Sequence, residues 1–209
     1  MNGKLVVFNH PLMHHKLSLI RDERTGTKDF RQTVSEIGTL MAYEVTRELP
    51  TKKILIKTPC GIAESYTLAK EVVIVPILRA GLGMVDGITA LIPTAKVGHI
   101  GLYRDEVTME PHQYYAKFPS IIKDAVVLIV DPMLATGGSV AKAIDIIKQT
   151  GATDISYVGI VAAPEGIKRI RESHPDVNIF VAVIDEKLNS NGYIVPGLGD
   201  CGDRLYGTK

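Results

Sequence analysis

The chain has 209 residues, of which 45% are hydrophobic and 22% charged, and its 24 basic and 23 acidic residues leave a formal net charge of +1. This length fits one large domain with a substantial core, and the near-neutral charge excludes a global field that would recruit nucleic acid or a membrane surface. Cys60 and Cys201 form no C-x-x-C pair, which argues against a disulfide framework or a zinc site. With no signal segment or membrane-length apolar run, we expect a cytoplasmic protein.

Hydrophobic periodicity predicts a chain in which strands alternate with helices. Residues 29–49 repeat apolar side chains at steps of three and four, which predicts a long amphipathic helix with Asp29 as its N-cap and Pro50 as its stop. Continuous apolar runs predict buried strands at 72–78, 96–103, 126–130, 155–162 and 178–184, and helical patterns follow at 82–91, 140–147 and after Pro164. This alternation implies an α/β fold with a parallel sheet covered on both faces.

The two ends of the chain differ from this pattern. Residues 1–28 look like an N-terminal extension, and residues 186–209 form a glycine-rich, aperiodic tail on what we expect to be a single domain over 1–209. In open α/β sheets, ligands bind beyond the carboxyl ends of the strands. The residues that directly follow the predicted strands are therefore the first candidates for a functional site.

The most informative of these segments is D-P-M-L-A-T-G-G-S at 131–139. Gly137 and Gly138 let the backbone approach a ligand, Thr136 and Ser139 add hydroxyl donors, and the next helix presents its free N–H groups. The segment is neither a Walker A loop nor a G-x-G-x-x-G fingerprint. It predicts a phosphate cradle beside a carboxylate, Asp131, that can accept hydrogen bonds from two sugar hydroxyls. The alternative is a plain strand-to-helix turn capped by Asp131.

Several motifs together resemble one family. Besides the 131–139 loop they are H-P-L-x-x-H-K-L at 10–17, V-P-I-L-R-A-G-L-G-M at 75–84, Y-R-D-E at 103–106 and Y-I-V-P-G-L-G-D-x-G-D-R at 193–204. The loop resembles the 5-phosphoribosyl-1-pyrophosphate (PRPP) loop of type I phosphoribosyltransferases, in the form that is typical of the uracil phosphoribosyltransferase family. The resemblance covers essentially the whole chain and implies the type I fold, with a mostly parallel central sheet flanked by helices.

The resemblance also implies the reaction and its residues. Uracil and PRPP would give uridine monophosphate (UMP) and pyrophosphate in pyrimidine salvage, with Arg79, Arg104 and Asp200 as catalytic residues. The implied PRPP-binding residues are Arg79, Arg104, Asp131, Pro132, Met133, Leu134, Ala135, Thr136, Gly137, Gly138, Ser139 and Asp200. The implied uracil-binding residues are Ile194, Gly199, Asp200 and Cys201, where the family has alanine in place of Cys201. Asp200 is also the candidate acceptor of the uracil N1 proton.

Further expectations concern the surroundings of this site. Residues 105–119 are expected to form a mobile hood that closes over PRPP and excludes water. Mg²⁺ is expected to bind mostly through PRPP oxygens, with Asp200 as a ligand directly or through water. The resemblance raises GTP as an effector, and the long helix and apolar extension favour a homodimer or higher homo-oligomer.

Two other classes of protein compete with this interpretation. An RNA-binding regulator of pyrimidine genes can share the fold, but it would require a basic stripe that the sequence lacks. A nucleoside kinase is opposed by the missing Walker lysine. His10, His14 and His15 are not predicted to bind metal, because no carboxylate or cysteine near them completes a set of ligands.

Overall fold

The computed structural model describes residues 2–104 and 111–208 of the chain. The central sheet consists of β1 (Leu5–Val7), β4 (Val72–Leu78), β5 (Lys96–Val97), β6 (His99–Arg104), β7 (Pro111–Lys117), β8 (Val126–Val130), β9 (Met133–Leu134), β10 (Ile155–Ala162) and β11 (Asn178–Ile184). Its strand order is β1-β11-β10-β8-β4-β6-β7, with β5 beside β4 and β9 beside β10. Within the described residues, the pairings of this central sheet are parallel except for the antiparallel pair β6–β7.

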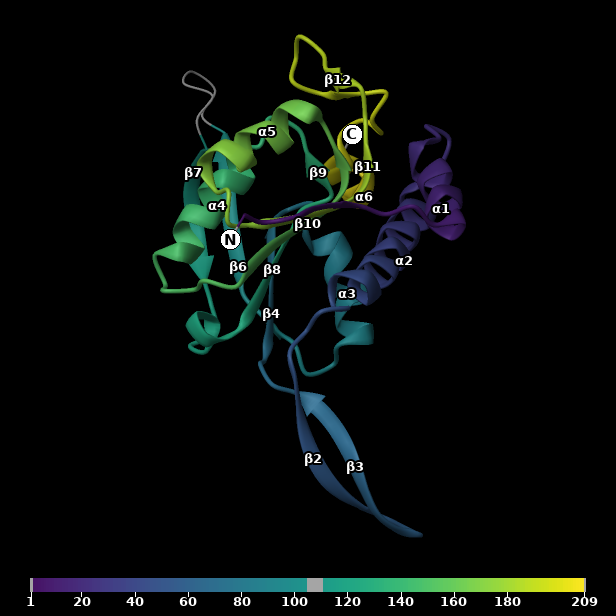
Figure 1. Cartoon of the computed structure of the whole chain (residues 1–209). Coiled ribbons are helices and arrows are strands. Elements are labelled where there is room, and N and C mark those ends of the chain that lie inside the picture. Colours follow the sequence, from purple (N-terminus) through teal and green to yellow (C-terminus); the bar gives the residue numbers. More distant parts are fainter. Residues whose placement is uncertain (1, 105–110, 209) are drawn as a thin grey trace.

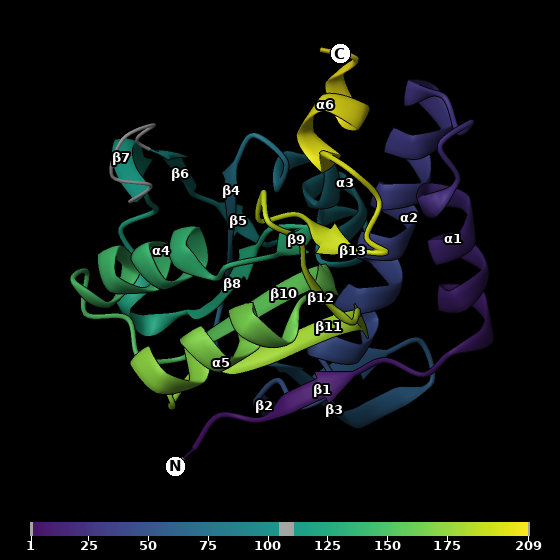
Figure 2. The same cartoon turned by 90° about the horizontal axis from the view of Figure 1, so that it is seen from above.

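Helices cover both faces of this sheet. They are α1 (Pro11–Arg21), α2 (Thr27–Val45), α3 (Leu82–Leu91), the 3₁₀ turn η1 (Ile122–Asp124), α4 (Gly138–Lys148), α5 (Pro164–Ser173) and α6 (Cys201–Tyr206). Figure 2 shows α1, α2 and α3 on one side of the sheet and α4 and α5 on the other. Because successive side chains of a strand point to opposite faces, Ile74 packs into the core under α1–α3 and Val75 into the core under α4 and α5. The predicted α/β class is confirmed.

The predicted elements agree closely with the observed ones in the middle of the chain. Strands β4, β8, β10 and β11 have the predicted bounds, and the apolar run at 96–103 divides into β5 and β6. The prediction of Asp29 as the N-cap of the long helix is wrong, because α2 begins at Thr27 with Gly26 at the cap position. Asp29 lies in the first turn instead, where its charge still complements the helix dipole.

A projecting hairpin is the main element that the sequence did not predict. It consists of β2 (Thr51–Thr58) and β3 (Gly61–Leu68), which pair antiparallel and form a sheet of their own. Figure 1 shows it extending away from the body of the molecule. Several of its apolar side chains face solvent, including Leu55 at 74% exposure and Ile62 at 70%. We name residues 51–68 the arm.

The two terminal segments are ordered parts of the fold. The N-terminal extension supplies β1, which pairs with β11, and helix α1. The tail contains the short strands β12 (Lys187–Leu188) and β13 (Ile194–Val195) and helix α6. It is fastened to α2 because the Arg31 guanidinium donates to the carbonyl oxygen of Leu205 at 2.8 Å. None of the described helices combines the length and apolar character that a membrane crossing requires.

Candidate active site

One cavity brings together the loop after β8 and the tail. It has a volume of about 350 Å³ and is lined by Ala80, by Asp131, Met133 and Ala135, and by residues 191–194 and 199–202. Ala80 follows β4 and the next three residues follow β8, so the cavity opens at the carboxyl ends of neighbouring parallel strands. The predicted uracil-binding residues thus share a cavity with the predicted ribose-binding carboxylate. Ala80, Asn191 and Gly202 also line it, although no sequence pattern singled them out for the base.

The phosphate cradle has the backbone that the glycines predicted. Gly137 has a φ of +77°, in the left-handed region that side chains disfavour, and a Cβ there would lie 2.9 Å from the carbonyl oxygen of Gly166. Helix α4 begins at the next residue, Gly138. Gly137 has no side chain to cap α4, and the N–H of Gly138 donates only a long hydrogen bond, of 3.5 Å, to Thr136 Oγ1, so the start of this helix can bind an anion.

Asp131 occupies the junction between the cradle and the cavity. Its Oδ1 accepts only a long hydrogen bond, at 3.4 Å, from the N–H of Met133. Its carbonyl oxygen accepts a hydrogen bond of 2.7 Å from the hydroxyl of the fully buried Tyr157. Burial raises the pKa of the Asp131 carboxyl to about 7, and the Met133 N–H opposes the shift. Hydroxyl donors from a ligand would favour the charged form of this carboxyl.

Arg79 lies directly after β4 and faces the tail. Its Nη2 lies 3.5 Å from Asp203 Oδ1, and its guanidinium lies 5.9 Å from the centre of the Tyr206 ring. The Tyr206 hydroxyl donates to the carbonyl oxygen of Arg79 at 3.1 Å. The Arg79 side chain remains 57% exposed, so its guanidinium is accessible to a ligand.

Arg104 and the hood are described only in part. Arg104 is the last residue of β6, and its backbone pairs with Pro111. Residues 105–110 of the predicted hood lie outside the described residues. Residues 111–117 form β7, which continues the sheet beyond β6, so this part of the predicted hood is a strand.

The side of the cavity that the sequence predicts to bind the base is built from the tail. Gly199 has a φ of +80°, and Asp200 caps α6 by accepting the N–H of Asp203 at 2.9 Å on Oδ1. Cys201 lines the cavity but is only 3% exposed, so a reagent has little access to its thiol. Burial raises the pKa of this thiol above its usual range, and the negative charges of Asp131 and Asp200 add to the effect.

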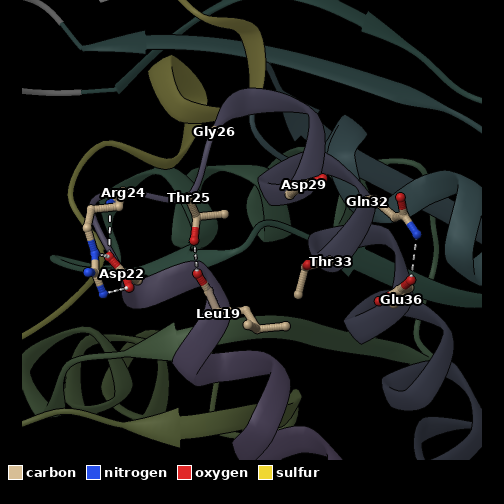
Figure 3. Close-up of a pocket in the computed structure, with 9 residues that line it drawn as sticks. All are labelled: Leu19, Asp22, Arg24, Thr25, Gly26, Asp29, Gln32, Thr33 and Glu36. Carbon is tan, nitrogen blue, oxygen red and sulfur yellow. Dashed lines mark hydrogen bonds and ion pairs between the residues drawn. The ribbon is translucent and has the colours of Figure 1, made fainter.

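A larger cavity of about 640 Å³ lies between α1 and α2 and does not suit an anionic substrate (Figure 3). Three carboxylates, those of Asp22, Asp29 and Glu36, line it together with Arg24. Arg24 already pairs with Asp22 at 2.7 Å. Among the described residues, no loop that follows a strand of the sheet lines this cavity, so the smaller cavity is the candidate active site.

A glycine-bearing anion loop after β8, a carboxylate at its start and a mostly parallel sheet define a type I phosphoribosyltransferase. The fold is similar to that of adenine phosphoribosyltransferase from Trypanosoma brucei, at a TM-score of 0.60 and 13% identity over 94% of this chain and 88% of that one. The chain belongs to the uracil phosphoribosyltransferase family, whose sequence model matches residues 6–208.

Two relatives illustrate how close this membership is. The uracil phosphoribosyltransferase of Acholeplasma laidlawii is 61% identical over 207 residues, which cover 99% of this chain and all of that one. The solved structure of the AQ2163 protein from Aquifex aeolicus has a TM-score of 0.92 and 42% identity, with 97% of each chain covered.

Proposed function

We propose that this protein transfers the phosphoribosyl group of PRPP to N1 of uracil, giving UMP and pyrophosphate in pyrimidine salvage. The observation that carries the proposal is the 350 Å³ cavity, which Asp131 of the cradle and Ile194, Gly199, Asp200 and Cys201 of the tail line together. The family membership supports the same reaction. It gives no support to the RNA-binding alternative.

The residues divide the work by position. The N–H groups at the start of α4, in residues 136–139, hold the 5-phosphate, and Asp131 accepts hydrogen bonds from the ribose hydroxyls. Departure of pyrophosphate leaves positive charge on the ribose, so Arg79 and Arg104 act by stabilising the leaving group. The cavity keeps sugar and base in line for attack, which removes an entropic part of the barrier.

Recognition of uracil rests on the backbone of the tail. Uracil presents acceptor, donor and acceptor groups along one edge, and the N–H and C=O groups around 199–201 can match that order. We propose that Asp200 lies between the base and PRPP and accepts the N1 proton. The hood, which includes strand β7, excludes water from the activated ribose.

Mg²⁺ is the proposed cofactor. The described residues contain no group of three or more His, Cys, Asp or Glu side chains able to hold a metal ion. Carboxylates at 131 and 200 do line the cavity, which fits a cation that arrives on PRPP and keeps most of its water. Asp200 would hold it directly or through water, and the ion would neutralise charge on pyrophosphate.

We also propose a homodimer or larger homo-oligomer in which the arm contacts a second copy of the chain. A two-stranded hairpin by itself is marginally stable in water, yet this one exposes Leu55, Ile62 and Tyr66. The body also has an apolar cavity of about 420 Å³ that is lined by residues such as Val7, Met13 and Leu40. Analytical ultracentrifugation of the wild type and of Leu55→Lys tests this, since dissociation of the variant is expected.

We further propose that GTP activates the enzyme and that the protein is cytoplasmic. Activation by GTP rests on the family resemblance, and UMP formation with and without GTP tests it. The cytoplasmic location rests on two unpaired cysteines, Cys60 at the tip of the arm and the buried Cys201.

A panel of free bases provides the test of the main reaction. Purified protein is incubated with PRPP, Mg²⁺ and uracil, cytosine, adenine or hypoxanthine, and nucleotides are separated by chromatography. Of the four bases, only uracil is expected to give a nucleotide, UMP. A parallel incubation of uridine with ATP reports kinase activity, and UMP formed only in that incubation would contradict the proposal.

A further inference from the structure

The turn at 195–197 lies between the two tail stretches that line the base cavity. Residues 191–194 precede it and residues 199–202 follow it, and none of 195–197 lines the cavity itself. Gly197 has a φ of +59°, and a Cβ there would lie 2.2 Å from the carbonyl oxygen of Ile194. The conformation of this turn therefore sets the spacing between the two lining stretches.

An ion pair from two distant elements holds this turn. Arg21, the last residue of α1, donates to both carboxylate oxygens of Asp185, at 2.6 Å and 2.9 Å. The same guanidinium donates to the carbonyl oxygen of Gly197 at 2.7 Å. Asp185 Oδ2 in turn accepts the N–H of Gly197 at 2.8 Å. Both backbone polar groups of Gly197 are thus bound to one charged pair.

The Arg21–Asp185 ion pair is largely buried and fixed in its orientation. The Asp185 side chain is 4% exposed and that of Arg21 is 25% exposed, so water screens the pair only weakly. Asp185 directly follows β11, and its N–H donates to the carbonyl oxygen of Ala162 at the end of β10 at 2.8 Å. The carboxylate is therefore fixed to the sheet, and the planar fork of Arg21 matches it in two places.

A second arginine fixes the tail beyond the cavity. Arg204 in α6 donates to the carbonyl oxygens of Leu198 at 2.9 Å and Asp22 at 2.6 Å. Its guanidinium lies 4.3 Å from the centre of the Phe30 ring in α2. The tail is therefore anchored to the α1–α2 segment on both sides of residues 199–201.

We propose that Arg21 and Asp185 are positioning residues for the uracil site, which hold the 195–197 turn so that Ile194 and residues 199–201 form the base pocket. This inference rests on the proposed function. Neither residue lines the cavity, so their effect on the base passes through the backbone of Gly197. The cradle at 131–139 lies on other elements, between β8 and the start of α4, so we expect it to keep its shape without the pair.

The test compares Arg21→Lys and Asp185→Asn with the wild type and with Lys16→Ala. Lys16 is the matched control, because it also lies on α1 and forms a half-buried ion pair, to Glu36, without touching the tail. Loss of a buried charged contact predicts a KM for uracil that rises about 10- to 100-fold in the two variants. The KM for PRPP is expected to stay within about twofold, as is every constant of Lys16→Ala.

Hydrogen–deuterium exchange of the ligand-free proteins supplies a readout that does not depend on turnover. Faster exchange is expected in residues 193–202 of Arg21→Lys and Asp185→Asn, with exchange in 131–139 unchanged. If the wild type forms no UMP, the proposed function fails, and exchange alone then decides whether the pair positions the tail. Equal rises of both KM values, or wild-type exchange in 193–202, would overturn the proposal and leave a pair that only stabilises the fold.

Discussion

Replacing Asp131 with asparagine should stabilise the ligand-free protein at neutral pH while it impairs catalysis. Burial raises the pKa of this carboxyl from its ordinary value of 3.8 to about 7. Because the folded-state pKa is raised, the folded protein binds the proton more tightly than the unfolded chain does. The contribution of this carboxyl to stability is therefore full below pH 3.8 and declines as the pH rises to about 7.

The size of the effect follows from the same two values. A difference of about 3 pKa units corresponds to about 4 kcal/mol, since each unit is worth about 1.4 kcal/mol. Asp131 is only half-buried and faces an open cavity, so water reduces the penalty to roughly 2–3 kcal/mol. The Asp131→Asn variant has no such penalty. Its stability relative to the wild type should therefore grow by that amount between pH 4 and pH 8.

Two measurements on the same preparations decide the matter. Urea unfolding of both proteins from pH 4 to pH 8 gives the stability difference, and steady-state kinetics give kcat/KM for PRPP. An amide accepts hydrogen bonds from the two ribose hydroxyls less well than a carboxylate does. The transition-state stabilisation measured by kcat/KM should therefore fall by about 2–4 kcal/mol. A variant that is less stable at every pH and keeps wild-type PRPP kinetics would show that Asp131 only caps the strand-to-helix turn.

Three further predictions concern the base, the leaving group and the thiols. Cytosine should be turned over up to ~10⁴-fold less efficiently than uracil, because its amino group meets a backbone donor where uracil has O4; comparable turnover would refute the backbone pocket. Arg104→Ala should lower kcat/KM for PRPP by a factor equivalent to about 2–4 kcal/mol and leave the Tm unchanged. A lower Tm with unchanged kinetics would show that the arginine only stabilises the fold. A maleimide should label Cys60 rapidly and Cys201 slowly, since Cys201 is buried and its pKa is raised. The Cys201→Ala variant should keep most activity. Rapid labelling of Cys201 in the folded protein, or an inactive Cys201→Ala variant, would contradict the proposed base pocket.

The sequence predicted β4, β8, β10 and β11 of the central sheet because burial on both faces leaves an unambiguous signal. Every residue of β8 and β10 is buried. Strand β8 is a continuous apolar run, and the residues of β10 are aliphatic apart from Ser156, Tyr157 and Gly159. The arm gave no such signal, since its side chains are largely exposed and lysines interrupt its apolar residues. Helix α6 has six residues, too few to display a period.

The same contrast holds for the site. The cradle is a local motif, so its residues were readable from nine consecutive positions. The Arg21–Asp185 pair joins positions 164 residues apart, and neither residue stands in a pattern that marks its partner. The burial of Cys201 also depends on packing between α6 and the rest of the fold, which residue spacing does not reveal.

A crystal structure of the protein with UMP tests the central claim most directly, because UMP joins the phosphate, ribose and base of the two proposed half-sites. We predict the phosphate on the N–H groups of 136–139, the ribose hydroxyls on Asp131, and the uracil edge against Ile194 and residues 199–201. The reaction site as described would be contradicted if UMP were bound elsewhere, such as in the acidic cavity between α1 and α2, or if its base pointed away from the tail.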